Sequence, residues 1–283
     1  MDPGQIVTIV RKMPFNINDL KVKPDTKLDL SNHDPSATPS FDGDKKQGQA
    51  RLKVLNARLE ELQDLLWAEG KNRVLFVIQA MDAGGKDGTI RHVFDGVNPS
   101  GVKVASFKKP SSKELAHDYL WRAHSQVPGD GELTIFNRSH YEDVLVVRVL
   151  ELVPKKRWER RYKHIVDFEQ MLVDEGTTII KIFLHISKDE QKERLQARLD
   201  EPEKNWKFEI GDLESRSHWD AYHDAFEEAL ARTSTEESPW YIIPANRKWY
   251  RNIAVSEIMI QTLEGLNMKF PDAEKGLDQV VID

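Results

Sequence analysis

Five apolar runs recur along the chain of 283 residues and alternate with segments of helical periodicity. They read RVLFVIQAM (73–81), VKVASF (102–107), ELTIFN (132–137), TTIIKIFLH (177–185) and WYIIP (240–244). A continuous apolar run is typical of a strand that is buried on both faces, as in a parallel sheet. The alternation therefore predicts an α/β fold, a three-layer α/β/α sandwich around a five-stranded parallel sheet.

The residues before the first run divide into two parts. Residues 1–43 are rich in Pro, Asp, Ser and Asn and lack sustained periodicity, so we expect an extended arm there. Leucines then recur at spacings of three and four from Leu52 to Leu66, which predicts an amphipathic helix that stops at Gly70. We expect one domain over residues 44–270 and a tail over 271–283.

Composition limits the class of protein. With 39% hydrophobic residues the chain can bury a sizeable core. It has no cysteine, which excludes disulfides and thiolate metal sites and suits a reducing compartment. We find neither a signal-peptide pattern nor about 18 consecutive apolar residues, so we expect a cytoplasmic protein that does not associate with membranes.

Charge is distributed unevenly. The formal net charge of −6 argues against general nucleic-acid affinity, and we expect no nucleic-acid partner. Between Lys86 and Lys163, however, 15 Lys and Arg residues stand against 10 Asp and Glu. A local anion site within an acidic protein is the simplest account.

The stretch QAMDAGGKDGTIRH (79–92) joins the first predicted strand to a helix. Such a loop directs backbone N–H groups and the positive end of a helix dipole at one spot, which suits phosphate. Lys86 adds a cation, and Asp82 opposes phosphate unless a metal intervenes, so we assign it to Mg²⁺. The usual P-loop pattern has Gly where Ala80 stands. The residues expected to line the phosphate are Ala83, Gly84, Gly85, Asp87, Gly88 and Thr89.

A second motif, IFNRSHYEDVLVVRV (135–149), follows the third predicted strand. Arg138 emerges where a guanidinium can meet a phosphoryl group, and Glu142 lies one helical turn later. Alternatives remain for both residues: Arg138 in a strand-end ion pair, and Glu142 as a solvated carboxylate in a first helical turn.

Further basic residues are candidates for phosphate or nucleotide contacts. They are Arg91, Lys103 and Arg122 near the predicted sheet, and Arg194, Arg198, Lys204 and Lys207 toward residues 198–222. That segment contains Pro202 and Gly211 and has little apolar content before Trp219. A mobile lid occupies this place in P-loop kinases, so we expect a lid there. The basic cluster at 155–163 is expected to be largely a solvated helix face.

Several long motifs resemble the second polyphosphate kinase family, most closely its third class. They are QAMDAGGKDGTIRHVFDGVNPSGVKVASFKKPS, HDYLWRAH, IFNRSHYEDVLVVRV, NWKFEIGDLESRSHWDAY and PWYIIPANRKWY, and the likeness runs from about residue 20 to about 270. The resemblance implies a P-loop kinase-like fold and an enzyme that transfers phosphoryl groups between polyphosphate and nucleotides. The third class is associated with both AMP and ADP as acceptors, with ATP as the product from ADP. In this family Ala80 and Asp87 are ordinary.

The resemblance also implies roles. Lys86 and Arg138 would hold the migrating phosphoryl group, and Arg198 would close from the lid. Mg²⁺, with Mn²⁺ as a substitute, would lie near Asp82 and Glu142. Asn137 departs from the Asp that is general in the first class, which makes Glu142 the better second carboxylate.

Two other readings of the sequence stay open. One is an ATP-dependent nucleoside monophosphate kinase of the thymidylate kinase type, and the other is a non-catalytic phosphate-binding scaffold. Relatives tend to be dimers or tetramers, so a homodimer or homotetramer is expected.

Overall fold

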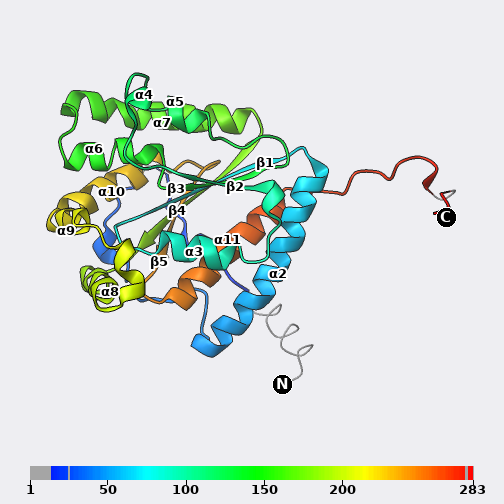
Figure 1. The fold of residues 1–283 in the computed structure, drawn as a ribbon, viewed down its shortest axis with the longest axis horizontal. Helices are drawn as coiled ribbons and strands as arrows, with labels where there is room; N and C mark the ends of the chain where they lie inside the picture. The colour runs from blue at the N-terminus through cyan, green and yellow to red at the C-terminus, as the bar shows by residue number, and fades with distance from the viewer. Residues whose placement is uncertain (1–13, 25, 278–279, 283) are drawn as a thin grey trace.

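The sheet contains five parallel strands in the order β2-β3-β1-β4-β5 (Figure 1). The computed structural model describes residues 14–24, 26–277 and 280–282. All five predicted runs form strands: β1 (Arg73–Ala80), β2 (Val102–Ser106), β3 (Leu133–Asn137), β4 (Thr177–His185) and β5 (Trp240–Pro244). The predicted α/β fold with a five-stranded parallel sheet is confirmed.

Helices cover both faces of the sheet, which makes three layers (Figure 1). One layer holds α2 (Lys45–Glu69), α3 (Lys86–Val93) and α11 (Lys248–Gly265), and the other holds α6 (Val146–Val149), α7 (Lys155–Asp174) and α10 (Trp219–Thr233). Shorter elements connect them: η3 (Pro99–Gly101), α4 (Ser112–Leu115), α5 (Trp121–His124) and η4 (His140–Asp143). Because helices pack on both sides, the central strands are buried along nearly their whole length and are mostly apolar. In β1, only Arg73 is not buried.

The helix predicted from the leucine spacing is α2. It begins with a capping box in which Asp44 and Gln47 bond reciprocally to each other's backbone, which satisfies N–H groups that the first turn leaves free. It ends before Gly70, whose φ of 62° lies in the left-handed region that favours glycine. The predicted stop is therefore confirmed.

The strand register aligns the carboxyl ends of neighbouring strands. Ile78 pairs with Asn137, Asn137 with Ser106, and Ala80 with Leu184. In open parallel sheets ligands bind in the crevice at this edge. The loop after β1 and the loop after β3 therefore meet there, although 50 residues separate Asp87 from Asn137 along the chain.

The described part of the N-terminal arm packs against the domain near β5. Val22 donates its backbone N–H to Trp240, and Lys21 forms an isolated antiparallel bridge with Tyr241. Residues 14–43 include two 3₁₀ turns, η1 (Ile17–Leu20) and η2 (Leu30–Asn32), and bury five apolar side chains: Phe15, Leu20, Val22, Leu30 and Phe41. This segment contributes to the core through these side chains.

The segment predicted as a lid is built from short helical pieces. It runs from the end of α8 (Lys188–Asp200) through η5 (Pro202–Lys207) and α9 (Gly211–Ser217) to the start of α10. Figure 1 shows α8 and α9 together at one end of the sheet. Trp206 and Ile210 are 78% and 83% exposed, whereas Trp219 is buried and anchors the return to the core. That this segment moves stays a prediction.

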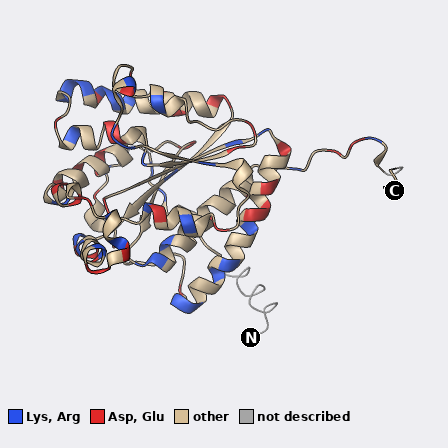
Figure 2. Cartoon of the chain, viewed as in Figure 1, with Lys and Arg blue, Asp and Glu red and all other residues tan. Residues whose placement is uncertain are grey.

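Basic residues gather on the outer side of α7 (Figure 2). Of the cluster at 155–163, Arg161 is buried and pairs with Asp143, whereas Lys155, Lys156, Arg157, Arg160 and Lys163 are exposed. The prediction that this cluster is largely a solvated face is confirmed. No helix among the described residues is long and apolar enough to cross a membrane.

Candidate active site

The loop between β1 and α3 turns tightly. Gly84 donates its N–H to the Met81 carbonyl at 2.9 Å, and a Cβ at Gly84 would come within 2.5 Å of Ala80 Cβ. Gly85 begins α3 with a φ of 103°. Glycine is needed at both positions, at the first for space and at the second for its backbone conformation. The loop therefore has the strand–turn–helix form of a phosphate cradle.

Lys86 lies in the first turn of α3. Its Nζ is 3.0 Å from the carbonyl oxygen of Ala80, the last residue of β1, to which it donates. The ammonium group therefore folds back over the carboxyl end of β1. Its side chain is partly buried, and it places a positive charge where the loop N–H groups converge.

Arg138 and Asp82 form an ion pair across the site. Arg138 Nη2 lies 2.8 Å from Asp82 Oδ1, and the two side chains are 42% and 21% exposed. Arg138 follows β3 directly and has a φ of 61°, an uncommon conformation for a residue with a side chain. Such local strain is characteristic of functional sites. The alternative expected for Arg138, an ion pair at the end of the strand, is therefore present.

Glu142 lies in η4, close to the same ion pair. Burial raises the pKa of Glu142 above its usual value, Arg138 and Lys86 offset part of this effect, and Asp82 adds to it. Burial and the neighbouring Arg138 likewise lower the pKa of Lys86, while Asp82 and Glu142 act in the opposite direction. The structure therefore brings two cations and two carboxylates within electrostatic range of one another, from two motifs that are far apart in sequence.

The carboxylates have the chemistry that a magnesium site requires. Mg²⁺ is usually held by one or two carboxylates, with water and substrate phosphates completing the octahedron. Asp82 and Glu142 supply two carboxylates at a partly exposed position beside the phosphate cradle. Among the described residues no group of three or more His, Cys, Asp or Glu side chains forms a closed metal site. The residues thus fit an open site that substrate phosphates would complete.

Two side chains of α8 donate hydrogen bonds to the backbone of the loop between β1 and α3. Arg194 donates to the carbonyls of Ala83 and Gly84 at 3.1 and 2.9 Å, and its Nε pairs with Glu190 at 2.7 Å. Gln191 donates to the Asp82 carbonyl at 3.0 Å. Arg194 was predicted to contact phosphate, but in this structure its guanidinium binds the loop backbone instead.

The other basic residues of the lid segment contact groups within that segment or at the end of α8. Arg198 donates to the Lys207 carbonyl and to Asp212 Oδ2, both at 3.0 Å. Lys207 lies over the ring of Trp206, and Lys204 pairs with Glu201 at the start of η5. Their contacts with phosphate stay predictions.

Three further predicted residues lie in α3, β2 and β3. Asn137 donates to Asp87 Oδ1 at 2.7 Å, which ties the end of β3 to the start of α3. Arg91 is exposed one turn farther along α3, and Lys103 is exposed in the first half of β2, away from the carboxyl edge. Neither Arg91 nor Lys103 forms part of the cluster around Lys86.

Arg122 is buried and borders a cavity of about 530 Å³ beside the carboxyl end of β2. It donates to the Lys108 carbonyl at 2.9 Å and stacks over Phe107. A cavity of this size can hold a nucleotide. The residues that line it with Arg122 are Val104, Ala105, Ser106, Phe107, Lys108, Lys109, Glu114, Trp121, Ser125 and Gln126.

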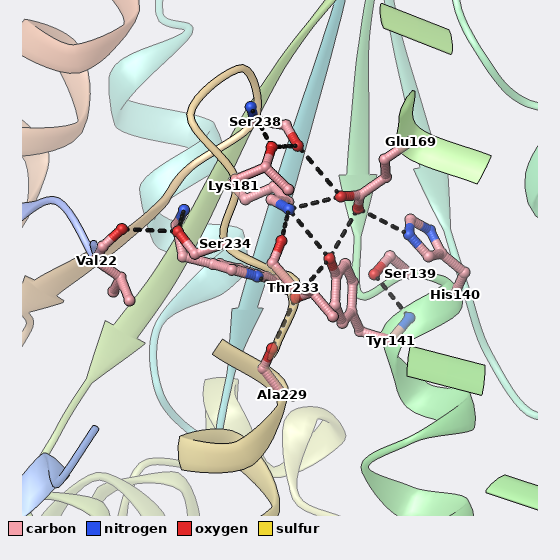
Figure 3. Close-up of polar contacts among 12 residues, drawn as sticks. Val22, Ser139, His140, Tyr141, Glu169, Lys181, Ala229, Thr233, Ser234 and Ser238 are labelled. Atoms are coloured by element: carbon pink, nitrogen blue, oxygen red, sulfur yellow. Dashed lines mark hydrogen bonds and ion pairs between the residues drawn. The ribbon is translucent and has the colours of Figure 1, made fainter. Parts of the chain in front are cut away.

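A buried polar network lies behind η4 (Figure 3). Lys181 of β4 pairs with Glu169 of α7 at 2.6 Å, and both side chains are almost fully buried. Tyr141 donates to Glu169 at 2.8 Å, and a ring nitrogen of His140 lies 3.2 Å from the same carboxylate. Lys181 also donates to the Thr233 carbonyl at the end of α10. The network thus joins η4, which carries Glu142, to β4, α7 and α10.

Replacing Lys181 with Met should lower the free energy of unfolding by about 3–5 kcal/mol, because it leaves the Glu169 carboxylate buried without its cation. In the native protein burial tends to raise the pKa of Glu169, but Lys181 and His140 outweigh it and hold the pKa below its usual value. Without Lys181 that pKa should rise above its unfolded value, so the variant should lose less stability at pH 5 than at pH 8. Urea unfolding at both pH values measures this.

The double variant Lys181→Met/Glu169→Leu is the control. It removes both charges and should recover part of the stability. Equal losses in the single variant at both pH values would contradict the assignment of the pair.

Three side chains near the site were not singled out from the sequence. Gln79 donates to Ser139 Oγ at 3.1 Å and so links β1 to η4. Its position was detectable, because it is a polar residue within an apolar strand. Gln191 and Arg251 gave no such signal, since their burial depends on contacts distant in sequence.

Comparison with known proteins identifies the family of the chain. A family model described as polyphosphate kinase 2 matches residues 42–271. The chain is 62% identical over 263 residues to the AMP/ADP-polyphosphate phosphotransferase of Meiothermus ruber, with 93% of this chain and 98% of that protein covered. It is 45% identical over 272 residues to the ADP-polyphosphate phosphotransferase of Rhodopseudomonas palustris, with 92% and 94% covered.

A solved structure agrees equally well. The crystal structure of polyphosphate kinase 2 from Arthrobacter aurescens TC1 superimposes with a TM-score of 0.91 at 45% sequence identity, covering 94% of this chain and 95% of that one. Similarity of sequence and of fold therefore extends over nearly the whole molecule. This chain belongs to the polyphosphate kinase 2 family.

Proposed function

We propose that this protein transfers the terminal phosphoryl group of inorganic polyphosphate to AMP and ADP, and that it runs the reverse reaction from ATP. The observation that carries the proposal is the convergence of Lys86 and Arg138 with two carboxylates on one phosphate cradle. Relatives named for AMP/ADP-polyphosphate and ADP-polyphosphate phosphotransfer support this choice of substrates.

The transfer is an in-line displacement. A phosphate oxygen of the acceptor attacks the terminal phosphorus of polyphosphate while the bond to the bridging oxygen breaks. Lys86 and Arg138 neutralise charge on the migrating group, which is the main contribution a protein makes to this reaction. Arg138 is held ready by Asp82 at 2.8 Å and turns to the phosphoryl group when phosphate enters.

Asp82 and Glu142 are the residues that would hold Mg²⁺. When bound, the ion neutralises phosphate oxygens and fixes their orientation. The lid segment would then cover the site and keep out water, which would otherwise compete with the nucleotide as acceptor. Arg198, at the end of α8, is positioned by Asp212 for this closure.

A comparison of donors tests the proposal. Purified protein with AMP and Mg²⁺ should form ADP faster from long-chain polyphosphate than from ATP. Faster transfer from ATP would favour a nucleoside monophosphate kinase of the thymidylate kinase type. Binding of polyphosphate without any transfer would favour a scaffold.

Neutralising Lys204 and Lys207 together should raise the KM for long polyphosphate more than the KM for a chain of a few phosphates. Both lysines lie in η5 and are exposed, so each would add a modest contact to a distant part of a long polyanion. Added salt should shrink the difference, because exposed charges are screened. Steady-state kinetics at two salt concentrations measures this, and equal effects on both chain lengths would contradict a basic channel in the lid.

Glu142→Asn should change the preference between AMP and ADP more than it changes overall turnover. Glu142 lies beside Lys86 and Arg138, where it senses the charge of the acceptor phosphates and their metal. The ratio of kcat/KM for the two acceptors is the measurement. Equal losses with AMP and ADP would make Glu142 a general metal or structural residue.

A further inference from the structure

Arg251 is a buried cation with an unusual set of partners. It lies in the first turns of α11 and is only 2% exposed. Its Nε and Nη2 donate to the Asn252 side-chain oxygen at 3.1 and 2.8 Å. Within residues 14–24, 26–277 and 280–282 no carboxylate pairs with it.

The guanidinium lies directly beneath the phosphate cradle. A Cβ built on Gly85 would come within 2.3 Å of Arg251 Nη1, and one built on Gly88 would lie 3.5 Å from Nη2. Gly85 is the N-cap of α3, so the guanidinium lies against the helix terminus that already carries positive charge. Arg251 Nη1 therefore lies against the loop.

A second guanidinium increases the excess of positive charge near Gly85. Arg194 Nη1 lies 3.3 Å from the same Gly85 Cβ position, although Arg194 has Glu190 as its own partner. Burial, and then repulsion from Arg194, lowers the pKa of Arg251 to about 9. At neutral pH the group is still charged.

The other buried arginines of the described residues have a carboxylate within 4.0 Å. Arg51 contacts Glu257 at 2.6 Å, Arg161 contacts Asp143 at 2.8 Å, and Arg122 lies 4.0 Å from Asp143. Leaving a buried charge without an opposite charge is strongly unfavourable, so a protein retains one only where something compensates it. At Arg251 an anion bound in the phosphate cradle, on the other side of Gly85, would supply that compensation.

We propose that Arg251 is a positioning residue whose counter-charge is the phosphate chain of the bound donor. This inference rests on the proposed function. Arg251 acts through the Gly85 backbone, because it holds the loop against α11. It also adds a positive potential, and salt screens this potential only weakly because the charge is buried. Polyphosphate, with one negative charge on each inner phosphate, would balance Arg251, Arg194 and the helix terminus together.

The test measures donor binding by calorimetry, with long-chain polyphosphate and with tripolyphosphate, in the absence of nucleotide. Arg251→Met should weaken binding of both by about 10- to 100-fold, the usual effect of removing a charged partner. Arg251→Lys should restore part of the affinity. Because the charge is buried, the loss should persist at high salt, unlike the loss from neutralising Lys204 and Lys207.

Two further variants separate this role from a structural one. In Arg251→Met alone, the buried side-chain oxygen of Asn252 loses its hydrogen-bond donor. Arg251→Met/Asn252→Leu removes this oxygen as well, so the double variant should fold well and still bind polyphosphate weakly. Arg51→Met is the matched control: Arg51 is a buried arginine of α2 that pairs with Glu257 of α11. It should lower Tm, because Glu257 loses its cation, and should leave donor affinity unchanged.

In steady-state assays, Arg251→Met should raise the KM for polyphosphate more than the KM for AMP. Unchanged donor affinity in the double variant would overturn the inference, and so would a loss that vanishes at high salt. If either of these results is found while the wild-type protein still transfers phosphoryl groups from polyphosphate, the proposed function is upheld and only the role of Arg251 is wrong. If wild-type protein fails to use polyphosphate at all, the proposed function itself is wrong.

Discussion

Lys86→Met should reduce phosphoryl transfer by about 1,000-fold, the upper end of the range for loss of one preorganised donor at a transition state. Its ammonium group lies over the end of β1 and donates to the Ala80 carbonyl. Methionine has a similar length, and the substitution removes the hydrogen bond to the Ala80 carbonyl. The fold should therefore survive, which thermal unfolding checks.

The pKa of Lys86 adds a second readout. Burial and Arg138 lower this pKa, so the charge is lost at a lower pH than in an ordinary lysine. Transfer by the wild-type protein should fall on the alkaline side as Lys86 loses its proton. A variant without Lys86 that keeps near-normal turnover would contradict its assignment to the migrating phosphoryl group.

Asp82→Asn should reduce the rate by at least about 100-fold, which corresponds to a few kcal/mol of lost charge stabilisation. It should also raise the concentration of Mg²⁺ needed for half-maximal activity, because an amide is a weaker ligand than a carboxylate. The variant removes the partner that holds Arg138 at 2.8 Å as well. Rates measured across a range of Mg²⁺ concentrations test both effects.

Asp87→Asn is the matched control for this substitution. Asp87 is an exposed carboxylate of the same loop whose partner is Asn137. It should leave the Mg²⁺ requirement near that of the wild type. Unchanged Mg²⁺ dependence in Asp82→Asn would move the metal site elsewhere.

Much of the fold was predictable because it depends on local patterns. Apolar runs bounded by polar residues marked all five strands, and the glycine stop of α2 fell where the left-handed conformation requires it. The loop after β1 and Arg138 after β3 were recognisable because parallel strands bring their carboxyl ends to one edge. That Lys86, Arg138 and a metal near Asp82 act on one phosphoryl group was implied by the resemblance to the second polyphosphate kinase family, and it stays a prediction.

The sequence was less informative wherever burial depends on distant contacts. Lys103 belongs to a basic stretch, yet its place in the first half of β2 puts it away from the carboxyl edge. Arg194 was expected to face phosphate, but α8 directs it to the carbonyls of Ala83 and Gly84. Arg251 lies in the first turns of a helix that looks like any other, and only the approach of α11 to Gly85 gives it a role.

The most direct test of the account is a single-turnover reaction with polyphosphate carrying a radiolabelled terminal phosphate. Enzyme in excess, AMP and Mg²⁺ should yield label in the β-phosphate of ADP, with none on the quenched protein and none transferred when Mg²⁺ is chelated. Label retained on the protein would contradict direct transfer. Failure to label ADP, under conditions in which ATP phosphorylates AMP, would contradict polyphosphate as the donor.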